Sequence, residues 1–194
     1  MTGGGDCPGL NAAIRTLTRT AIHSYGYEVL GVLDGFAGLI ESRCRPLTEA
    51  DVRGILRVGG TILGASNRTN PFAWREHDTA PIIDASDRVI QTLEDWGVDA
   101  LVVVGGDGTL TLASFFAARG VPVIGVPKTI DNDVHGTAYS IGFDTCVATV
   151  TDALDRLHTT AESHHRVMLV EVMGRTAGWV ALHAGIAGGA DIIL

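Results

Sequence analysis

Apolar side chains recur three or four residues apart in several stretches of this chain, which is the spacing of one face of an α-helix. The clearest stretch covers 10–25, and Gly26 provides a natural stop. A second predicted helix, 48–58, begins with Thr48 and Asp51 spaced as a capping pair. Further helices are predicted over 85–96, 143–161 and 177–187.

Short apolar and β-branched runs predict strands over 28–33, 100–104, 121–126 and 167–172. The runs 100–104 and 121–126 are continuously apolar, as in strands buried on both faces of a parallel sheet. Helices and strands alternate, with glycines at the ends of the runs. The pattern therefore predicts an α/β protein with two Rossmann-like domains and mainly parallel sheets, dividing near Ala138 into 1–137 and 138–194.

Composition excludes some classes of function. The 194 residues are 46% hydrophobic, enough for a substantial core, and carry a net charge of -8 with scattered basic residues. A nucleic-acid or anionic-membrane surface is therefore not expected. Three separated cysteines, no apolar run long enough to span a bilayer and no leader pattern favour the cytoplasm.

Two glycine-rich segments carry candidate phosphate chemistry. The first, 2–11, reads TGGGDCPGLN and leads into the first predicted helix, where backbone N–H groups can point at a phosphate. The second, GGDGT at 105–109, follows a buried strand and offers Asp107 as an oxygen ligand for Mg²⁺. The alternatives stay open: the first can be a tight turn, and Asp107 can be a simple helix cap.

The segment 127–133, PKTIDND, follows another buried strand. It combines Asp131 and Asp133 with the hydroxyl of Thr129 and with Lys128, the only lysine of the chain. One carboxylate can accept the proton of an attacking alcohol while the second organises neighbouring groups. A solvated acidic loop is the alternative.

A fourth segment supplies arginines suited to phosphate. Arg166 follows two histidines, and Arg175 lies in EVMGRT at 171–176, where Gly174 would admit a ligand next to the backbone. Taken alone, both arginines are more often surface salt-bridge residues. The histidines lack the spacing of a zinc site.

Taken together and in this order, TGGGDCPGLNAAIR, GGDGT, PKTIDND, GFDT and EVMGRTAGW resemble the phosphofructokinase family. The resemblance covers nearly the whole chain and implies the phosphofructokinase-like α/β fold. It implies ATP-dependent phosphorylation of fructose 6-phosphate to fructose 1,6-bisphosphate in glycolysis, with Mg²⁺ as cofactor.

The resemblance also implies roles for the acceptor side. Asp131 would deprotonate the sugar 1-hydroxyl with support from Thr129 and Asp133, and Arg175 would stabilise the transferring phosphoryl group. Arg166 would reach the sugar phosphate across a subunit interface of a homo-oligomer, commonly a tetramer. The implied substrate-binding residues are Thr129, Ile130, Asp131, Asp133, Arg166, Met173, Gly174 and Arg175.

On the donor side, the resemblance implies that Asp107 holds Mg²⁺ and that Arg15 and Arg19 match an allosteric nucleotide site of some members. The implied ATP-binding residues are Gly4, Arg68, Gly106, Asp107, Gly108 and Thr109. The segment around Arg68 departs from the family pattern, because it has one residue more between the glycine and the arginine.

Two positions bear on the choice of donor. Pyrophosphate-dependent members have an aspartate where this chain has Gly108, so Gly108 favours ATP. Lys128 is the residue that pyrophosphate users have. The mixture resembles a subgroup that retains ATP.

The family pattern also includes a strand before Thr2 and a segment after Leu194. The chain is therefore expected to be truncated at both ends, poorly stable and inactive alone. The rival functions are a pyrophosphate-dependent phosphotransferase, a non-catalytic subunit that binds nucleotide or sugar phosphate, and, less supported by the motifs, an NAD kinase.

Overall fold

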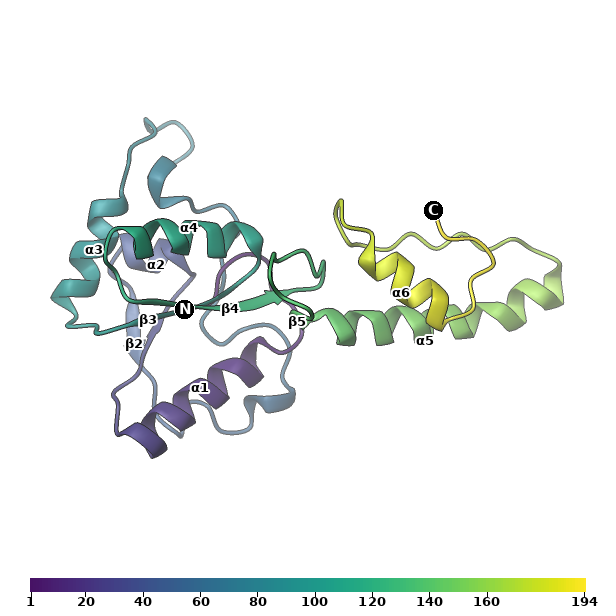
Figure 1. Ribbon diagram of the computed structural model, residues 1–194, viewed down its shortest axis with the longest axis horizontal. Coiled ribbons are helices and arrows are strands. Elements are labelled where there is room, and N and C mark those ends of the chain that lie inside the picture. Colours follow the sequence, from purple (N-terminus) through teal and green to yellow (C-terminus); the bar gives the residue numbers. More distant parts are fainter. The chain divides into compact units, whose positions relative to one another are not determined.

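The computed structural model describes all residues, Met1–Leu194, and divides into two compact units, Met1–Lys128 (unit 1) and Thr129–Leu194 (unit 2) (Figure 1). The predicted functional domains, 1–137 and 138–194, stay a prediction. None of the helices is both long enough and apolar enough to span a membrane.

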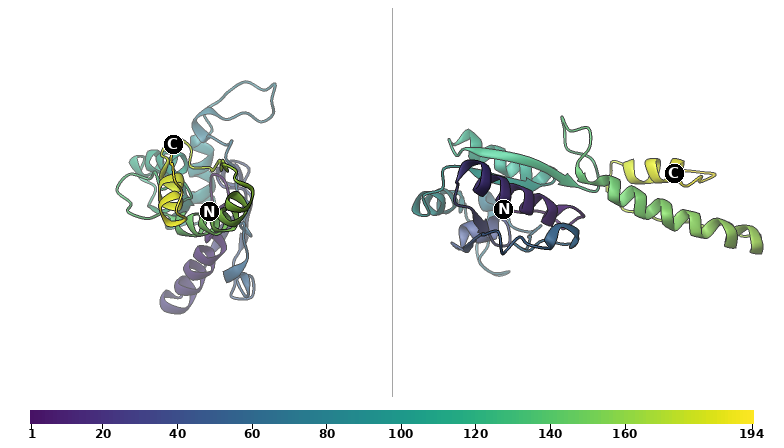
Figure 2. Two further views of the ribbon diagram at one scale, coloured as in Figure 1. Left: turned by 90° about the vertical axis from the view of Figure 1, so that its right-hand side faces the viewer. Right: turned by 90° about the horizontal axis from the view of Figure 1, so that it is seen from below.

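Unit 1 is built around a parallel strand pair, β3 (Leu101–Gly105) and β4 (Val123–Thr129), in which Leu101 lies opposite Val123. Thr2 forms a parallel bridge with Val104 on the other side of β3. Helices α1 (Leu10–Tyr25) and α4 (Asp107–Ala118) cover opposite faces of these strands, and the view from below places α1 in front of them (Figures 1 and 2). The carboxyl ends of the strands therefore lead into the predicted phosphate loops.

The rest of unit 1 packs around this α/β layer. Its elements are β1 (Leu30–Val32) paired antiparallel with β2 (Cys44–Pro46), α2 (Phe36–Ile40), α3 (Ser86–Asp95), and the 3₁₀ turns η1 (Ile55–Arg57) and η2 (Pro71–Ala73). The main core includes Phe36 and Phe116, whose rings stack at 5.7 Å. A second cluster comprises Ile14, Leu47, Val52, Ile55 and Leu63.

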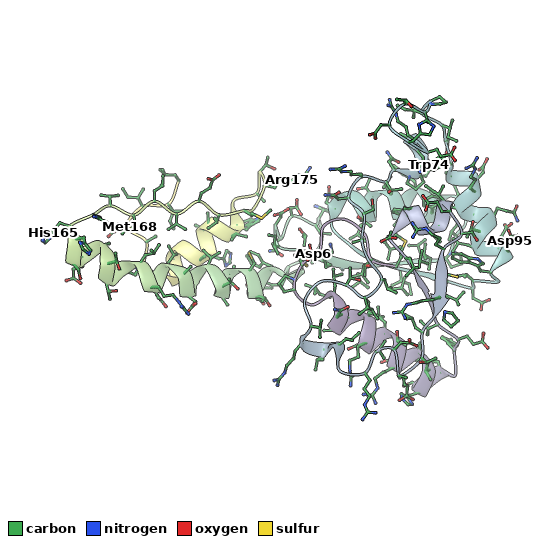
Figure 3. The ribbon with its side chains drawn as sticks, turned by 180° about the vertical axis from the view of Figure 1, so that it is seen from behind. Asp6, Trp74, Asp95, His165, Met168 and Arg175 are labelled. Atoms are coloured by element: carbon green, nitrogen blue, oxygen red, sulfur yellow. The ribbon has the colours of Figure 1, made fainter.

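Unit 2 consists of β5 (Ile141–Gly142), the long helix α5 (Phe143–His164) and α6 (Trp179–Ala187). The two helices pack on each other, and the His158 ring nitrogen Nε2 lies 2.6 Å from the carbonyl oxygen of Gly188. Phe143 is fully buried and meets His183 edge-on. Helix α5 is followed by His165, which has the left-handed conformation, and the chain then returns along the helix (Figure 3).

The α/β fold class is confirmed, and four of the predicted helices are present with closely matching bounds. The predicted helix 48–58 is wrong. Thr48 and Asp51 do form the capping pair, since the Thr48 amide donates to Asp51 Oδ2 at 2.8 Å. Gly54, with φ 78°, interrupts the turn, and only η1 follows.

The predicted strand 167–172 is also wrong. The segment pairs with no neighbouring strand, and the side chains of Val167 and Leu169 are 98% and 89% exposed. A strand needs a partner for its backbone N–H and C=O groups, and an apolar run alone cannot supply one.

Candidate functional site

In unit 1 the glycine-rich segment connects the strand-like residues Met1 and Thr2 to α1. Gly4 has φ 78°, a left-handed conformation that glycine adopts at little cost. The Gly3 amide donates to the Val104 carbonyl at 2.9 Å, and the Gly4 amide donates to the Ser66 carbonyl at 3.1 Å. The glycine-rich loop is therefore fixed between the end of β3 and the loop that contains Ser66.

The segment GGDGT lies where β3 ends and α4 begins. Asp107 and Gly108 are exposed in the first turn of α4, where helix N–H groups lack intrahelical partners. A Cβ atom added at Gly108 would meet nothing within 4 Å, so the surface there is open. The geometry suits a polyanion that approaches the helix N-terminus.

Thr109 is a spacer between the two glycine loops. Its side chain is 9% exposed, and an added Cβ atom would lie 2.6 Å from its Cγ2 at Gly3 and 2.5 Å at Gly105. Only glycine allows this approach on either side. The sequence identified Thr109 by its motif but gave no sign that its methyl group packs the loops together.

Arg68 lies in the same loop as Ser66, beside the first glycine-rich loop. The loop is held by Thr2, whose hydroxyl donates to the Gly64 carbonyl at 2.7 Å, and by the Gly4 to Ser66 hydrogen bond. Ser66 and Thr69 hydroxyls are 2.8 Å apart. Arg68 itself is exposed, so its guanidinium is accessible to an anion beside the loop.

No group of three or more His, Cys, Asp or Glu side chains is placed to hold a metal ion. The single exposed carboxylate of Asp107 does fit a magnesium ion that reaches the protein with a nucleotide. Mg²⁺ usually keeps several waters and binds through one or two carboxylates plus substrate phosphates.

Lys128 is buried beneath the first glycine loop. Its ammonium donates to the carbonyl oxygens of Gly3, at 3.0 Å, and Gly5, at 2.5 Å. Burial lowers the pKa of Lys128, whereas the nearby Cys7 and Asp6 act in the opposite direction. The sequence predicted a donor-selecting residue here, and its engagement with the loop backbone was not foreseen.

In unit 2 the loop that carries the two aspartates is closed by a polar pair absent from the predicted site. Asn132, with φ 51°, accepts from the Ser140 amide at 2.9 Å and donates to the Ala138 carbonyl at 3.1 Å. The Ser140 hydroxyl donates to the Thr129 carbonyl at 2.8 Å. Asparagine tolerates the left-handed conformation, which was the one available signal.

Asp131 and Arg175 line the same open hollow of about 590 Å³, together with Glu171, Val172 and Met173. The Thr129 hydroxyl accepts from the Asp131 amide at 3.1 Å and thereby fixes the turn that presents the Asp131 carboxylate. The hollow combines carboxylates with one guanidinium and is large enough for a small polar ligand. Glu171 and Val172 were not among the predicted site residues.

Asp133 lies beside this hollow and faces Arg175. Its Oδ2 is 3.7 Å from Arg175 Nη1. Arg175 has φ 54°, which is unfavourable for a residue with a Cβ atom, and follows Gly174 in a tight turn. Gly174 is buried, Ile130 is half-buried and Met173 is exposed.

Arg166 is not brought to this hollow within one chain. It follows His165 beyond the end of α5, and Figure 3 shows His165 and Arg175 at opposite ends of unit 2. The helix between has 22 residues, which corresponds to about 33 Å. The Arg166 side chain is exposed.

Cys146, in the first turn of α5, is the cysteine of unit 2. Burial and, second, the negative charge of Asp131 raise the pKa of Cys146. The ionisation of this thiol is therefore coupled to the charge of Asp131, in addition to its burial.

Comparison with known proteins matches the sequence profile described as "Phosphofructokinase" to residues 1–194. The chain is 58% identical to the ATP-dependent 6-phosphofructokinase 2 of Clostridium perfringens, over all of this chain and 54% of that protein. It is 54% identical to the pyrophosphate–fructose 6-phosphate 1-phosphotransferase of Streptomyces coelicolor, with the same coverage of each chain. The chain thus spans about half the length of the curated relatives it matches.

A similar solved structure is the phosphofructokinase from Saccharomyces cerevisiae, with a TM-score of 0.83 and 38% identity over 98% of this chain and 28% of that chain. The Pichia pastoris enzyme in the T-state gives a TM-score of 0.85 with 30% identity over 97% of this chain and 20% of that chain.

Proposed function

Because the chain belongs to the phosphofructokinase family, we propose that the protein transfers the γ-phosphoryl group of ATP to the 1-hydroxyl of fructose 6-phosphate, in glycolysis. The observation that carries the proposal is the shared hollow of Asp131 and Arg175, with Asp133 beside it. A base next to an oriented guanidinium is the equipment that phosphoryl transfer from an alcohol nucleophile requires.

On the acceptor side, the Asp131 carboxylate accepts the proton of the 1-hydroxyl as its oxygen attacks the γ-phosphorus. The bond from phosphorus to the bridging oxygen breaks, and ADP leaves. Thr129 holds the backbone of Asp131 through the 3.1 Å hydrogen bond. Arg175, oriented by Asp133, neutralises charge that develops on the transferring group.

The sugar phosphate is bound by the loop residues around the hollow and by a second copy of the chain. Ile130, Met173 and Gly174 contact the sugar, and Arg166 of a neighbouring copy binds its phosphate as a bidentate fork. The length of α5 supports the second part, because Arg166 directly follows His165, and Figure 3 shows His165 and Arg175 at opposite ends of unit 2. A homotetramer in the cytoplasm is the proposed state.

On the donor side, the nucleotide phosphates approach the N-termini of α1 and α4. Asp107 would hold Mg²⁺, which would neutralise negative charge on the phosphates when bound. The donor contacts proposed are Gly4, Arg68, Gly106, Asp107, Gly108 and Thr109.

The open surface at Gly108 supports ATP as donor, because it leaves room where a carboxylate would repel the α-phosphate. Lys128, and the pyrophosphate-dependent relative at 54% identity, favour pyrophosphate as the second candidate. Arg15 and Arg19, in α1, are proposed as contacts of an allosteric nucleotide.

The test is a coupled assay for fructose 1,6-bisphosphate in the complete gene product, with Mg²⁺ and either ATP or pyrophosphate. Turnover with ATP alone is expected. Turnover with pyrophosphate alone would identify pyrophosphate, and not ATP, as the phosphoryl donor. Binding of nucleotide and fructose 6-phosphate without turnover would favour a non-catalytic subunit. Phosphorylation of NAD in place of the sugar would favour an NAD kinase.

A further inference from the structure

Lys128 bridges two peptide carbonyls of the glycine-rich loop. It is the only lysine of the chain, its side chain is 2% exposed, and its ammonium bonds to the Gly3 and Gly5 carbonyl oxygens at 3.0 and 2.5 Å. These carbonyls lie on either side of Gly4, the left-handed residue of the loop. The bridge joins residues more than 120 positions apart in the sequence.

A buried ammonium is costly unless hydrogen bonds replace its water. Lysine normally extends along apolar surface and keeps its charge in solvent, whereas Lys128 turns its charge into the protein. Burial lowers the pKa of Lys128, and Asp6 and Cys7 oppose this. The two hydrogen bonds to loop carbonyls therefore compensate the burial of the ammonium and fix Lys128 to the loop.

The bridge also determines where the loop amides point. All peptide bonds are trans, so the carbonyl and N–H of one peptide unit point in opposite directions. The unit between Gly3 and Gly4 directs its carbonyl to Lys128 and its N–H to Ser66. The unit between Gly5 and Asp6 directs its carbonyl to Lys128, so the Asp6 N–H points away from the ammonium.

We propose that Lys128 is a positioning residue of the donor site, which holds the Gly3 and Gly5 carbonyls and thereby aims the Asp6 amide at the donor phosphates. The proposal rests on the proposed function, since it takes this loop to bind the donor. Lys128 then influences the donor through the loop backbone. Because its ammonium is hydrogen-bonded to two loop carbonyls, Lys128 does not select pyrophosphate over ATP by direct contact, and ATP remains a suitable donor.

The test compares Lys128→Met, of similar length without charge, and Lys128→Arg, which keeps N–H donors for both carbonyls. Val52→Ala serves as the control, because it removes buried methyl groups in the second core cluster, apart from the donor residues. Binding of Mg-ATP is measured by calorimetry, kcat and KM by the coupled assay, and mobility of residues 2–10 by amide hydrogen exchange.

We expect Lys128→Met to raise the Kd and KM for Mg-ATP about tenfold or more, since two hydrogen bonds from a charged group are lost. Amide exchange in the loop should accelerate, while kcat at saturating Mg-ATP stays within about threefold. Lys128→Arg should recover most of the affinity, and Val52→Ala should leave the Kd unchanged.

Unchanged Kd or loop exchange in Lys128→Met would overturn the proposal. So would a fall in kcat at unchanged Kd, which would assign Lys128 to the reacting phosphate, or an arginine variant no better than methionine. A wild-type protein that binds neither Mg-ATP nor pyrophosphate would overturn the proposed function, and with it the donor role of Lys128, before any variant is made.

Discussion

Arg175 Nη1 lies 3.7 Å from Asp133 Oδ2, and this contact joins the two loops that border the hollow of unit 2. The side chains are 66% and 21% exposed. An ion pair of this length and exposure contributes little to stability. The ion pair instead orients the Arg175 side chain, because Asp133 limits the positions that its exposed guanidinium can adopt.

The first prediction follows from this orientation. Arg175→Ala should lower kcat about 10²- to 10³-fold, because a charge that stabilises the transferring phosphoryl group is removed. The melting temperature should hardly change. Arg156→Ala is the control, since Arg156 forms a more exposed pair with Asp152 on α5, outside the hollow. Equal effects on kcat in the two variants would exclude a catalytic role for Arg175.

The second prediction concerns the proposed base. Asp131→Asn keeps the shape of the side chain but cannot accept the hydroxyl proton, so kcat should fall about 10²- to 10⁴-fold. Binding of fructose 6-phosphate, measured by calorimetry, should change far less. Asp155→Asn, at an exposed position of α5, is the control. Activity that survives in Asp131→Asn would transfer the role of base to another group.

The third prediction reads the charge of Asp131 without any turnover. Burial and the Asp131 charge raise the pKa of Cys146, so its thiolate forms only at more alkaline pH than an ordinary thiol requires. In Asp131→Asn one of the two causes is gone, and the pKa of Cys146 should fall. The measurement is the pH profile of iodoacetamide alkylation at Cys146, followed by mass spectrometry.

Cys44 is the internal control for the alkylation measurement at Cys146. Burial alone raises the pKa of Cys44, so its alkylation profile should be the same in both proteins. A Cys146 profile that does not move would mean that Asp131 is too far away, or too well solvated, to affect the thiol.

Sequence patterns predicted the elements whose signal is local. The helix over 10–25 has an apolar stripe and terminal glycines, and α1 has the same bounds. Helix α2 has only five residues, too few for a period, and is defined by packing of Phe36 on Phe116. The runs 121–126 and 167–172 look alike in sequence, yet only the first pairs with a strand, because pairing depends on residues distant in the chain.

The candidate site divides in the same way. Residue type and motif predicted roles for Asp107, Asp131 and Arg175, since their chemistry is carried by the side chain itself. The burial of Lys128 against loop carbonyls depends on tertiary contacts over more than 120 residues, which no local pattern encodes. The hydrogen bond from Ser140 to Asn132 was missed for the same reason, because serine is common in any loop.

The fourth prediction tests the open surface at Gly108. A Cβ atom there meets nothing within 4 Å, so Gly108→Asp should fold with unchanged stability. Its carboxylate would repel the α-phosphate, and kcat/KM for ATP relative to pyrophosphate should fall about 10²-fold, as expected for two like charges held together. Gly108→Ala, which adds no charge, should keep the original ratio. An equal loss in both variants would point to a steric effect.

The fifth prediction concerns the packing of the two glycine loops on Thr109. In Gly3→Ala the new Cβ atom would lie 2.6 Å from Thr109 Cγ2, so the free energy of unfolding should fall by about 1–3 kcal/mol. Gly5→Ala is the matched control in the same loop, because its Cβ atom meets nothing within 4 Å. Urea unfolding measures both.

Thr109→Ser removes the methyl group that causes the conflict and keeps the hydroxyl. In the double variant, Gly3→Ala should therefore cost much less than it does beside Thr109, a coupling of about 1 kcal/mol or more in a double-mutant cycle. Additive effects would contradict the spacer role, because they would show that an alanine at position 3 is accommodated without meeting Thr109. A measured coupling would show that the methyl group of Thr109 sets the spacing of the two glycine-rich loops. A larger side chain at Gly3 or Gly105 would then push the loops apart.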